Sequence, residues 1–266
     1  MQVVLHTRQR ELDLLGAVQS SGRAVQIDSS GVDAEPFAYA GRCWNPFDPM
    51  VHPKVHVSTE VSCGTIEIGR LGEALHRRMT ALVSRLQVVE HLCRADVEEA
   101  EAAVDPLTSV LCDDDRFSRR IQAGRKIRAV LNVLPSGLQS TTYCSKRNKY
   151  IGLHFDDFKD HRSASVELGN VRFCVNLGTA PRYLCFVPVS FGEAQIEALK
   201  SKERYGESKL GGLAAKYCIA RNPTAYRVTV EPGEYYVAPT QNLIHDGQTN
   251  NSGCNDVSLS LRFGLE

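Results

Sequence analysis

The sequence has few features of a nucleic-acid-binding, membrane or secreted protein. Lys plus Arg and Asp plus Glu each number 31, so the formal net charge is zero, whereas nucleic-acid-binding proteins usually carry basic patches. No apolar run approaches the roughly 18 residues that a membrane helix requires. Charged residues begin too early in the N-terminal stretch for a signal peptide. We therefore expect neither a nucleic-acid nor a membrane partner.

Paired cysteine motifs are also lacking. The nine cysteines are scattered and odd in number, and without a CxxC pair they form neither a zinc knuckle nor a thioredoxin-type motif. Cys174 and Cys185 lie inside apolar stretches, where a free cysteine acts as a small core residue. This usage predicts a reducing, cytoplasmic location.

Hydrophobic residues make up 42% and charged residues 23% of the chain, as in ordinary globular proteins. We expect a single domain over residues 1–266, with a mixed, helical support region at 1–135 and a strand-rich core at 136–266. Apolar spacing predicts helices. They are expected near 8–19, 69–93, 96–111, 116–131 and 193–200.

From about residue 138 the pattern becomes that of strands. We expect them at 138–144, 150–156, 171–177, 183–189, 226–230, 234–237 and 257–263. Glu231-Pro232-Gly233 suits a type II turn between two of them. Helices followed by a run of antiparallel strands indicate an α+β fold around a double-stranded β-helix, or jelly roll.

The candidate chemistry begins at His154-Phe155-Asp156, at the end of a predicted strand. Side chains two positions apart on a strand share a face, so His154 and Asp156 can point at one ion. His245 follows later in the chain, after the predicted strand 234–237. Two imidazoles and one carboxylate on one side of a metal leave open positions opposite, which is the arrangement of non-haem Fe(II) oxygenases.

The last predicted strand adds a polar face. Ser258, Ser260 and Arg262 alternate with apolar residues, and polar groups directed into a barrel are costly without a polar ligand. The guanidinium of Arg262 suits a carboxylate.

Residues 138–266 resemble the Fe(II)/2-oxoglutarate-dependent dioxygenase superfamily through the HxD strand, the Pro-Gly turn, the distal histidine and the terminal arginine strand. The resemblance implies Fe(II) bound by His154, Asp156 and His245, with 2-oxoglutarate and O₂ as co-substrates. It also implies that Arg262 binds the distal carboxylate of 2-oxoglutarate. Residues expected to assist at the co-substrate are Ser260, Ser258, Tyr143 and Asn176. The interval from His245 to Arg262 is longer than usual in the family, which makes Arg172 an alternative anchor.

The implied reaction is hydroxylation of an unactivated C–H bond with release of succinate and CO₂, or less commonly desaturation or cyclisation. Charged groups near the expected mouth favour a small polar substrate, such as an amino acid or specialised metabolite. Residues expected to contact it are Arg172, Tyr150, His161 and Arg162. The oligomeric state is not indicated by the sequence.

Other interpretations remain open. The substrate could be a peptide or protein residue, or the chain could be a cupin-like barrel that binds metal or ligand without turnover. His154 and His245 could be structural histidines, and Arg262 a surface residue. Arg172 and Asn176 could serve packing, and His161 and Arg162 could belong to a solvated loop.

Overall fold

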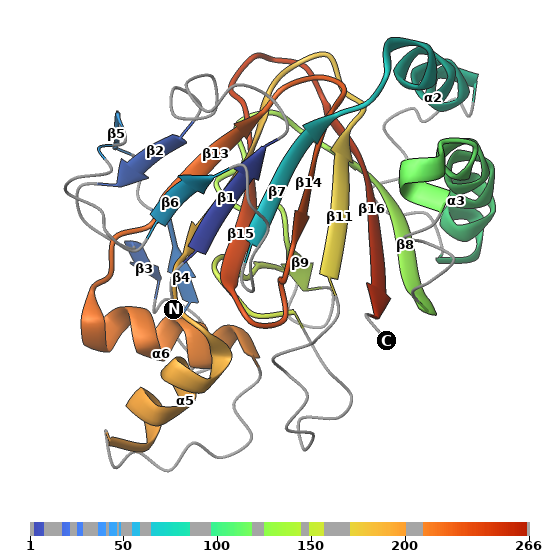
Figure 1. Cartoon of the computed structure of the whole chain (residues 1–266). Coiled ribbons are helices and arrows are strands. Elements are labelled where there is room, and N and C mark those ends of the chain that lie inside the picture. Colours follow the sequence, from blue (N-terminus) through green and yellow to red (C-terminus); the bar gives the residue numbers. More distant parts are fainter. Residues whose placement is uncertain are drawn as a thin grey trace.

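The structure is a computed structural model of the chain. It describes residues 3–7, 18–21, 26–28, 37–40, 43–46, 48, 55–58, 65–85, 97–118, 125–144, 149–156, 171–200 and 210–264. The described part is a mixed fold of largely antiparallel sheets with helices at the flanks (Figure 1).

The larger sheet has seven strands in the order β6-β1-β7-β14-β11-β16-β8. Its strands are β1 (Val3–Thr7), β6 (Val55–Ser58), β7 (Thr65–Arg70), β8 (Arg125–Leu134), β11 (Val171–Asn176), β14 (Glu234–Ala238) and β16 (Asp256–Gly264). β1 runs parallel to both β6 and β7, while the other pairs are antiparallel.

The smaller sheet has five strands in the order β15-β12-β13-β2-β5. Its strands are β2 (Val18–Ser21), β5 (Trp44–Pro46), β12 (Arg182–Val187), β13 (Tyr226–Val230) and β15 (Ile244–Thr249). Two further pairs stand apart, β3 (Gln26–Asp28) with β4 (Phe37–Tyr39), and β9 (Tyr143–Cys144) with β10 (Lys149–Tyr150).

A buried apolar cluster joins the two sheets. Ile66, Cys174 and Tyr236 contribute from the larger sheet, and Leu184 and Phe186 from the smaller one. Because alternate side chains of a strand point to opposite faces, each sheet can direct one face at the other. The two sheets therefore enclose a common interior, into which the candidate ligands also project.

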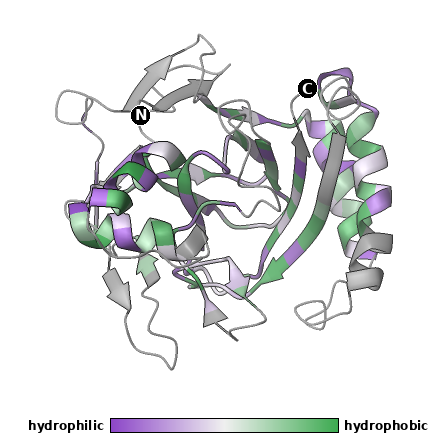
Figure 2. Cartoon of the chain, turned by 90° about the horizontal axis from the view of Figure 1, so that it is seen from below, coloured by the Kyte–Doolittle hydropathy of each residue, from purple (hydrophilic) through white to green (hydrophobic). Residues whose placement is uncertain are grey.

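Helices cover the outer face of the larger sheet. α2 (Glu73–Arg85) and α3 (Val97–Cys112) bury Met79 and Leu107 against Phe173 of β11 and Leu259 of β16. Figure 1 shows both helices beside β8 and β16, and Figure 2 shows apolar and polar residues alternating along them. Their apolar sides supply the second core of the protein.

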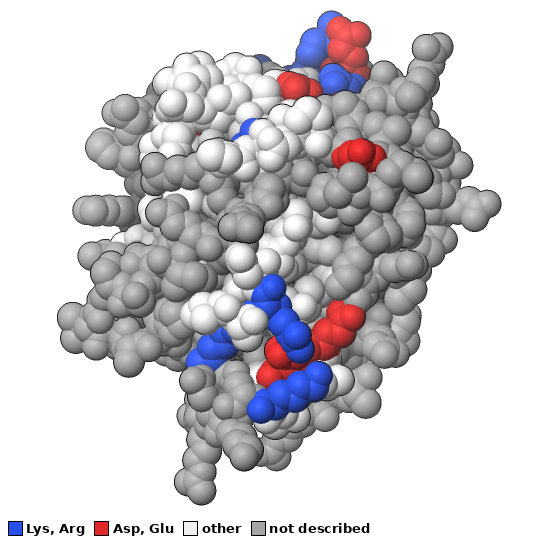
Figure 3. Space-filling view, turned by 90° about the vertical axis from the view of Figure 1, so that its left-hand side faces the viewer, with Lys and Arg blue, Asp and Glu red and all other residues white. Residues whose placement is uncertain are grey.

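A second helix pair flanks the other end. α5 (Phe191–Lys200) and α6 (Leu210–Arg221) share a buried cluster with Leu153 and Phe155. Phe155 lies between two candidate ligands, so this packing supports the segment that carries them. On the outside, Arg221 of α6 pairs with Glu197 of α5 at 2.5 Å. Figure 3 shows Lys or Arg and Asp or Glu side chains close together on the lower part of the face that it draws.

Most of the predicted elements occur. The helix near 96–111 corresponds to α3, and the strands near 171–177, 226–230 and 257–263 correspond to β11, β13 and β16. The helix expected at 69–93 is described from 73 to 85, but residues 69 and 70 end strand β7 rather than begin the helix. The strands expected at 138–144 and 150–156 are mostly absent: around residues 145–148 only the two-residue strands β9 and β10 pair, and residues 151–156 contribute isolated bridges.

Three further expectations were wrong or incomplete. Residues 125–134 form strand β8 rather than the end of a helix at 116–131; Ile127, Ala129, Leu131 and Val133 alternate with the period of a strand. Of the helix at 8–19, the last two residues belong to β2 and the rest lies outside the described residues. α6 was not predicted, because its glycine pair resembles a loop.

No helix in the described part of the chain is long and apolar enough to cross a membrane.

Candidate metal centre

Local backbone pairing places the two histidines side by side. His154 lies in a short extended segment that forms a β-bridge with His245 of β15. The backbone N–H of each residue donates to the carbonyl of the other, at 3.0 Å and 2.9 Å. Two residues on, the Asp156 N–H donates to the carbonyl of Thr240 at 3.1 Å. Three backbone hydrogen bonds therefore fix the starting points of the three side chains.

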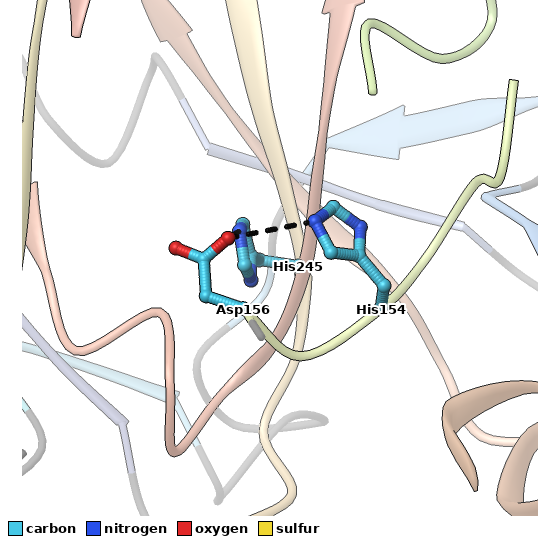
Figure 4. Close-up of side chains that lie close together, drawn as sticks. All are labelled: His154, Asp156 and His245. Carbon is cyan, nitrogen blue, oxygen red and sulfur yellow. Dashed lines mark ion pairs between the residues drawn. The ribbon is translucent and has the colours of Figure 1, made fainter. Parts of the chain in front are cut away.

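The side chains converge on one point, as Figure 4 shows. One potential ligand atom from each of His154, Asp156 and His245 lies within 4.8 Å of the others. Nε2 of His154 and Nε2 of His245 are each 3.7 Å from Oδ1 of Asp156. The structure thus brings together the three residues that the sequence singles out.

The donor atoms fit a metal ion. The three side chains are buried, yet Nε2 of both His154 and His245 has no hydrogen-bond partner in the described structure. Each Nδ1 lies near a carbonyl oxygen, that of Gly152 at 2.8 Å or Leu243 at 3.1 Å. When Nδ1 carries the proton and donates to that carbonyl, the lone pair of Nε2 is left to bind a metal, as in most metal-binding histidines.

The carboxylate is held by three side chains. Arg172 donates from Nη2 to Oδ1 of Asp156 at 2.6 Å and from Nε to Oδ2 at 3.2 Å. The hydroxyl of Thr240 donates to Oδ2 at 2.5 Å. Nη2 of Arg262 also donates to Oδ1. The carboxylate plane is therefore fixed from both of its oxygens.

These contacts set the charge of the site. Burial raises the pKa of Asp156. The combined lowering effect of Arg172, His245, His154 and Arg262 is larger, so the pKa lies well below its usual value. Burial lowers the pKa of His245 well below its usual value despite the opposing effect of Asp156. Near neutral pH, Asp156 is ionised and His245 neutral, which are the forms that bind metals.

A cavity of about 180 Å³ adjoins the centre. His245, Arg172 and Arg262 line it together with Arg182 of β12. Gly247, two residues after His245, also lines it; a Cβ there would lie 2.2 Å from Oγ1 of Thr141. The absence of a side chain at Gly247 thus lets Thr141, another lining residue, pack closely against β15.

The other predicted site residues are distributed unevenly. Ser260 and Tyr143 line the cavity, and the Tyr143 and Tyr150 rings meet edge to face, with their centroids 5.3 Å apart. Ser258 is fully buried, with no hydrogen-bond partner for Oγ in the described structure. The amide of Asn176 bonds the backbone of Gly178, Ala180 and Val230; neither Ser258 nor Asn176 is among the described lining residues. His161 and Arg162 lie outside the described residues.

Sequence reasoning missed two residues. Thr240 lies between the strand predicted at 234–237 and His245, and nothing in its neighbours indicates a bond to Asp156, which lies 84 positions earlier. Arg182 directly precedes the strand predicted at 183–189 and is the first residue of β12. The sequence alone does not tell whether its side chain points into the protein. That direction follows only from the register of β12 against β15.

Comparisons with known proteins give a remote likeness. No family model matches the sequence, and no curated protein does. Among solved structures, apo HygX from Streptomyces hygroscopicus is 16% identical and has a TM-score of 0.39, covering 75% of this chain and 82% of its own. HygX has also been solved with nickel and 2-oxoglutarate, at 17% identity.

The Kdo hydroxylase KdoO is a second such structure. It is a non-heme Fe(II) alpha-ketoglutarate-dependent dioxygenase, solved with succinate and Fe(III). It is 13% identical with a TM-score of 0.40, over 77% of this chain and 80% of its own. With TM-scores of 0.39 and 0.40, these likenesses do not establish a function for this chain.

Proposed function

We propose that the chain is a non-haem Fe(II) oxygenase that uses 2-oxoglutarate and O₂. The observation that carries this proposal is the pair of buried, unpartnered Nε2 atoms of His154 and His245, both 3.7 Å from Asp156 Oδ1. Two imidazoles and one carboxylate on one side of a metal are typical of non-haem Fe(II) oxygenases, whereas structural zinc sites are closed by four ligands.

The bound iron and 2-oxoglutarate would supply the oxidising chemistry. This chain's own residues hold and orient the reactants. His154, Asp156 and His245 would bind the metal, Arg172 and Thr240 fix the carboxylate, and the cavity provides guanidinium groups for a carboxylate of the co-substrate. A binding barrel without turnover would have no need of that cationic cavity beside the metal.

We further propose that the two-sheet core is a jelly roll. The order β14-β11-β16-β8 in the larger sheet and β15-β12-β13 in the smaller one supports it. Chain-adjacent strands such as β11 and β12 fall in different sheets, as do β13 and β14, so the chain repeatedly crosses between the sheets as in a jelly roll. This arrangement would place the histidines of one sheet opposite Arg172 and Arg262 of the other.

We propose a small polar molecule as the primary substrate, hydroxylated with release of succinate and CO₂. The modest cavity and its polar lining of Thr141, Thr142, Ser260 and arginines support this class. A cytoplasmic location is also proposed, because six described cysteines form no disulfide with another described residue, as expected in a reducing compartment; they are Cys43, Cys144, Cys174, Cys185, Cys218 and Cys254.

Anaerobic titration with Fe(II), followed by 2-oxoglutarate, tests the proposal. We expect a weak visible absorption band that requires both additions and is lost in His245→Ala. Succinate release with small-molecule and peptide libraries then separates the two substrate classes. A protein that binds neither Fe(II) nor 2-oxoglutarate would contradict the function, and stimulation by peptides alone would contradict the substrate class.

A further inference from the structure

Three arginines line the cavity, but they lie at different depths and have different partners. The side chains of Arg172 and Arg262 are 18% and 23% exposed, and both donate to Asp156. The side chain of Arg182 is 5% exposed and has no bond to Asp156 among the contacts of the described residues. Arg182 is thus the deepest of the three.

The surroundings of Arg182 leave donors for a ligand. Its Nη1 donates to Sγ of Cys174 at 3.2 Å, a weak acceptor. Its Nε is 3.6 Å from Oδ1 of Asp256, too long for a hydrogen bond, and has no hydrogen-bond partner in the described structure. A buried guanidinium whose donors are so poorly satisfied is costly unless a ligand completes its contacts.

The strand register places Arg182 at a suitable distance from the metal ligands. Arg172 pairs with Arg262 across β11 and β16, and both contact Asp156. Cys174, which accepts the bond from Arg182, lies two residues further along β11. Two residues of a strand span roughly 6.6 Å, comparable to the length of a five-carbon dicarboxylate that chelates a metal at one end.

The same register makes Arg262 less suited to the far end of that molecule. It lies beside Asp156, at the level of the metal ligands. Its guanidinium and that of Arg172 meet the same oxygen, Oδ1. A distal carboxylate bound there would have to fold back toward the metal instead of extending into the cavity.

We propose that Arg182 binds the distal carboxylate of 2-oxoglutarate at the floor of the cavity, and that Arg262 is a positioning residue for Asp156. This assignment rests on the proposed function. It moves the co-substrate anchor from the last strand, where sequence reasoning expected it, to β12 in the opposite sheet. Nε of Arg182 lies on the side of Asp256, so the ligand would be bound by the Nη groups, of which Nη1 has only the weak acceptor Sγ of Cys174.

The test compares 2-oxoglutarate with 2-oxopentanoate, which has the same carbon chain but lacks the distal carboxylate. Dissociation constants of both are measured anaerobically on the Fe(II) protein from the visible absorption band. The dissociation constant of 2-oxopentanoate divided by that of 2-oxoglutarate measures the preference for the distal carboxylate. This ratio reports the distal contact alone, since the metal-chelating end of the two molecules is identical. Fe(II) affinity is measured separately for every variant.

We expect Arg182→Met to lower that ratio by roughly tenfold to a hundredfold, as for loss of a charged hydrogen bond, with little change in Fe(II) affinity. Arg262→Met is the matched control; it should leave the ratio near the wild-type value and weaken Fe(II) binding. If Arg262→Met removes the preference while Arg182→Met retains it, the assignment is wrong.

Arg182→Met leaves the Asp256 carboxylate buried without its cation and could destabilise the fold. Two further variants therefore separate loss of the ligand contact from destabilisation. Arg182→Met combined with Asp256→Asn removes both charges and should lower the ratio equally. Arg182→Lys keeps the charge but loses the planar fork, and its ratio should fall by a smaller factor. A wild-type ratio in either folded variant would overturn the assignment. Wild-type protein without any band would overturn the proposed function itself.

Discussion

The strands that surround the metal centre and the strands near the N-terminus are built into the same sheets in different ways. β11, β12, β13, β14, β15 and β16 come from one stretch of chain, residues 171–264, and pair antiparallel. β1, β6 and β7 extend the larger sheet, and β2 and β5 the smaller one (Figure 1). The later stretch supplies His245 and the side chains that hold Asp156, while His154 and Asp156 lie in the segment before it. The earlier strands extend the two sheets.

This division predicts different effects for mutations in the two regions. Changes around His245 and Asp156 should alter metal binding with little effect on unfolding. Changes where the N-terminal strands join the sheets should lower stability while leaving the affinity of the folded protein for metal unchanged. A variant that changed both the metal affinity and the free energy of unfolding would contradict this separation.

Loss of a ligand should give the largest effect. His245→Ala removes one of three donors, so Fe(II) affinity should fall by more than about a hundredfold, since even groups that only orient ligands typically account for about 10- to 100-fold. Turnover should be abolished. Anaerobic Fe(II) titration measures this, with His76→Ala as the control, because His76 lies on α2 away from the centre. Wild-type affinity in His245→Ala would exclude His245 as a ligand.

Thr240→Val should have the next largest effect on the centre. It removes the 2.5 Å hydrogen bond to Oδ2 of Asp156 at nearly constant volume, so Fe(II) affinity should fall by about tenfold. Thr80→Val is a matched control, because the Thr80 hydroxyl bonds only backbone carbonyls of its own helix. Equal affinities for both variants would show that Thr240 does not position the carboxylate.

Gly69→Ala tests the junction of β7 with β14. A Cβ at Gly69 would lie 2.4 Å from the ring of Tyr235, which is buried against Phe117 and Phe173. The free energy of unfolding should fall by about 1–3 kcal/mol, as for overpacking, measured by urea denaturation. Gly72→Ala is the control, since a Cβ there meets nothing within 4 Å. A weakened Fe(II) affinity in folded Gly69→Ala would contradict the prediction that the two regions act separately.

Arg227→Met tests the edge of the smaller sheet, and its effect should be the smallest. The guanidinium of Arg227 lies 4.5 Å from the Trp44 ring centroid and 4.2 Å from that of Tyr183, and its Nε donates to Gln19 at 2.6 Å. Loss of these contacts should lower the free energy of unfolding by about 1–2 kcal/mol. Emission of Trp44, the sole tryptophan, reports the change. Arg221→Met, which removes an exposed ion pair, should have little effect.

Much of the later stretch could be predicted from sequence because its signals are local. Alternation identified β11 and β16, and the spacing of His154 and Asp156 placed both side chains on one face. The helix expected at 116–131 was wrong because the residues of β8 also allow helical spacing. Short N-terminal strands such as β2 and β5 carry little pattern of their own, since their pairing depends on distant partners.

The sequence by itself determined the candidate ligands, because the chemistry of histidine and aspartate and a two-residue spacing are properties of the chain. Only the tertiary structure decided what surrounds them. Thr240 and Arg262 reach Asp156 across 84 and 106 positions, and Arg182 enters the cavity from the opposite sheet. These contacts depend on strand register, which long-range packing fixes and no local pattern encodes.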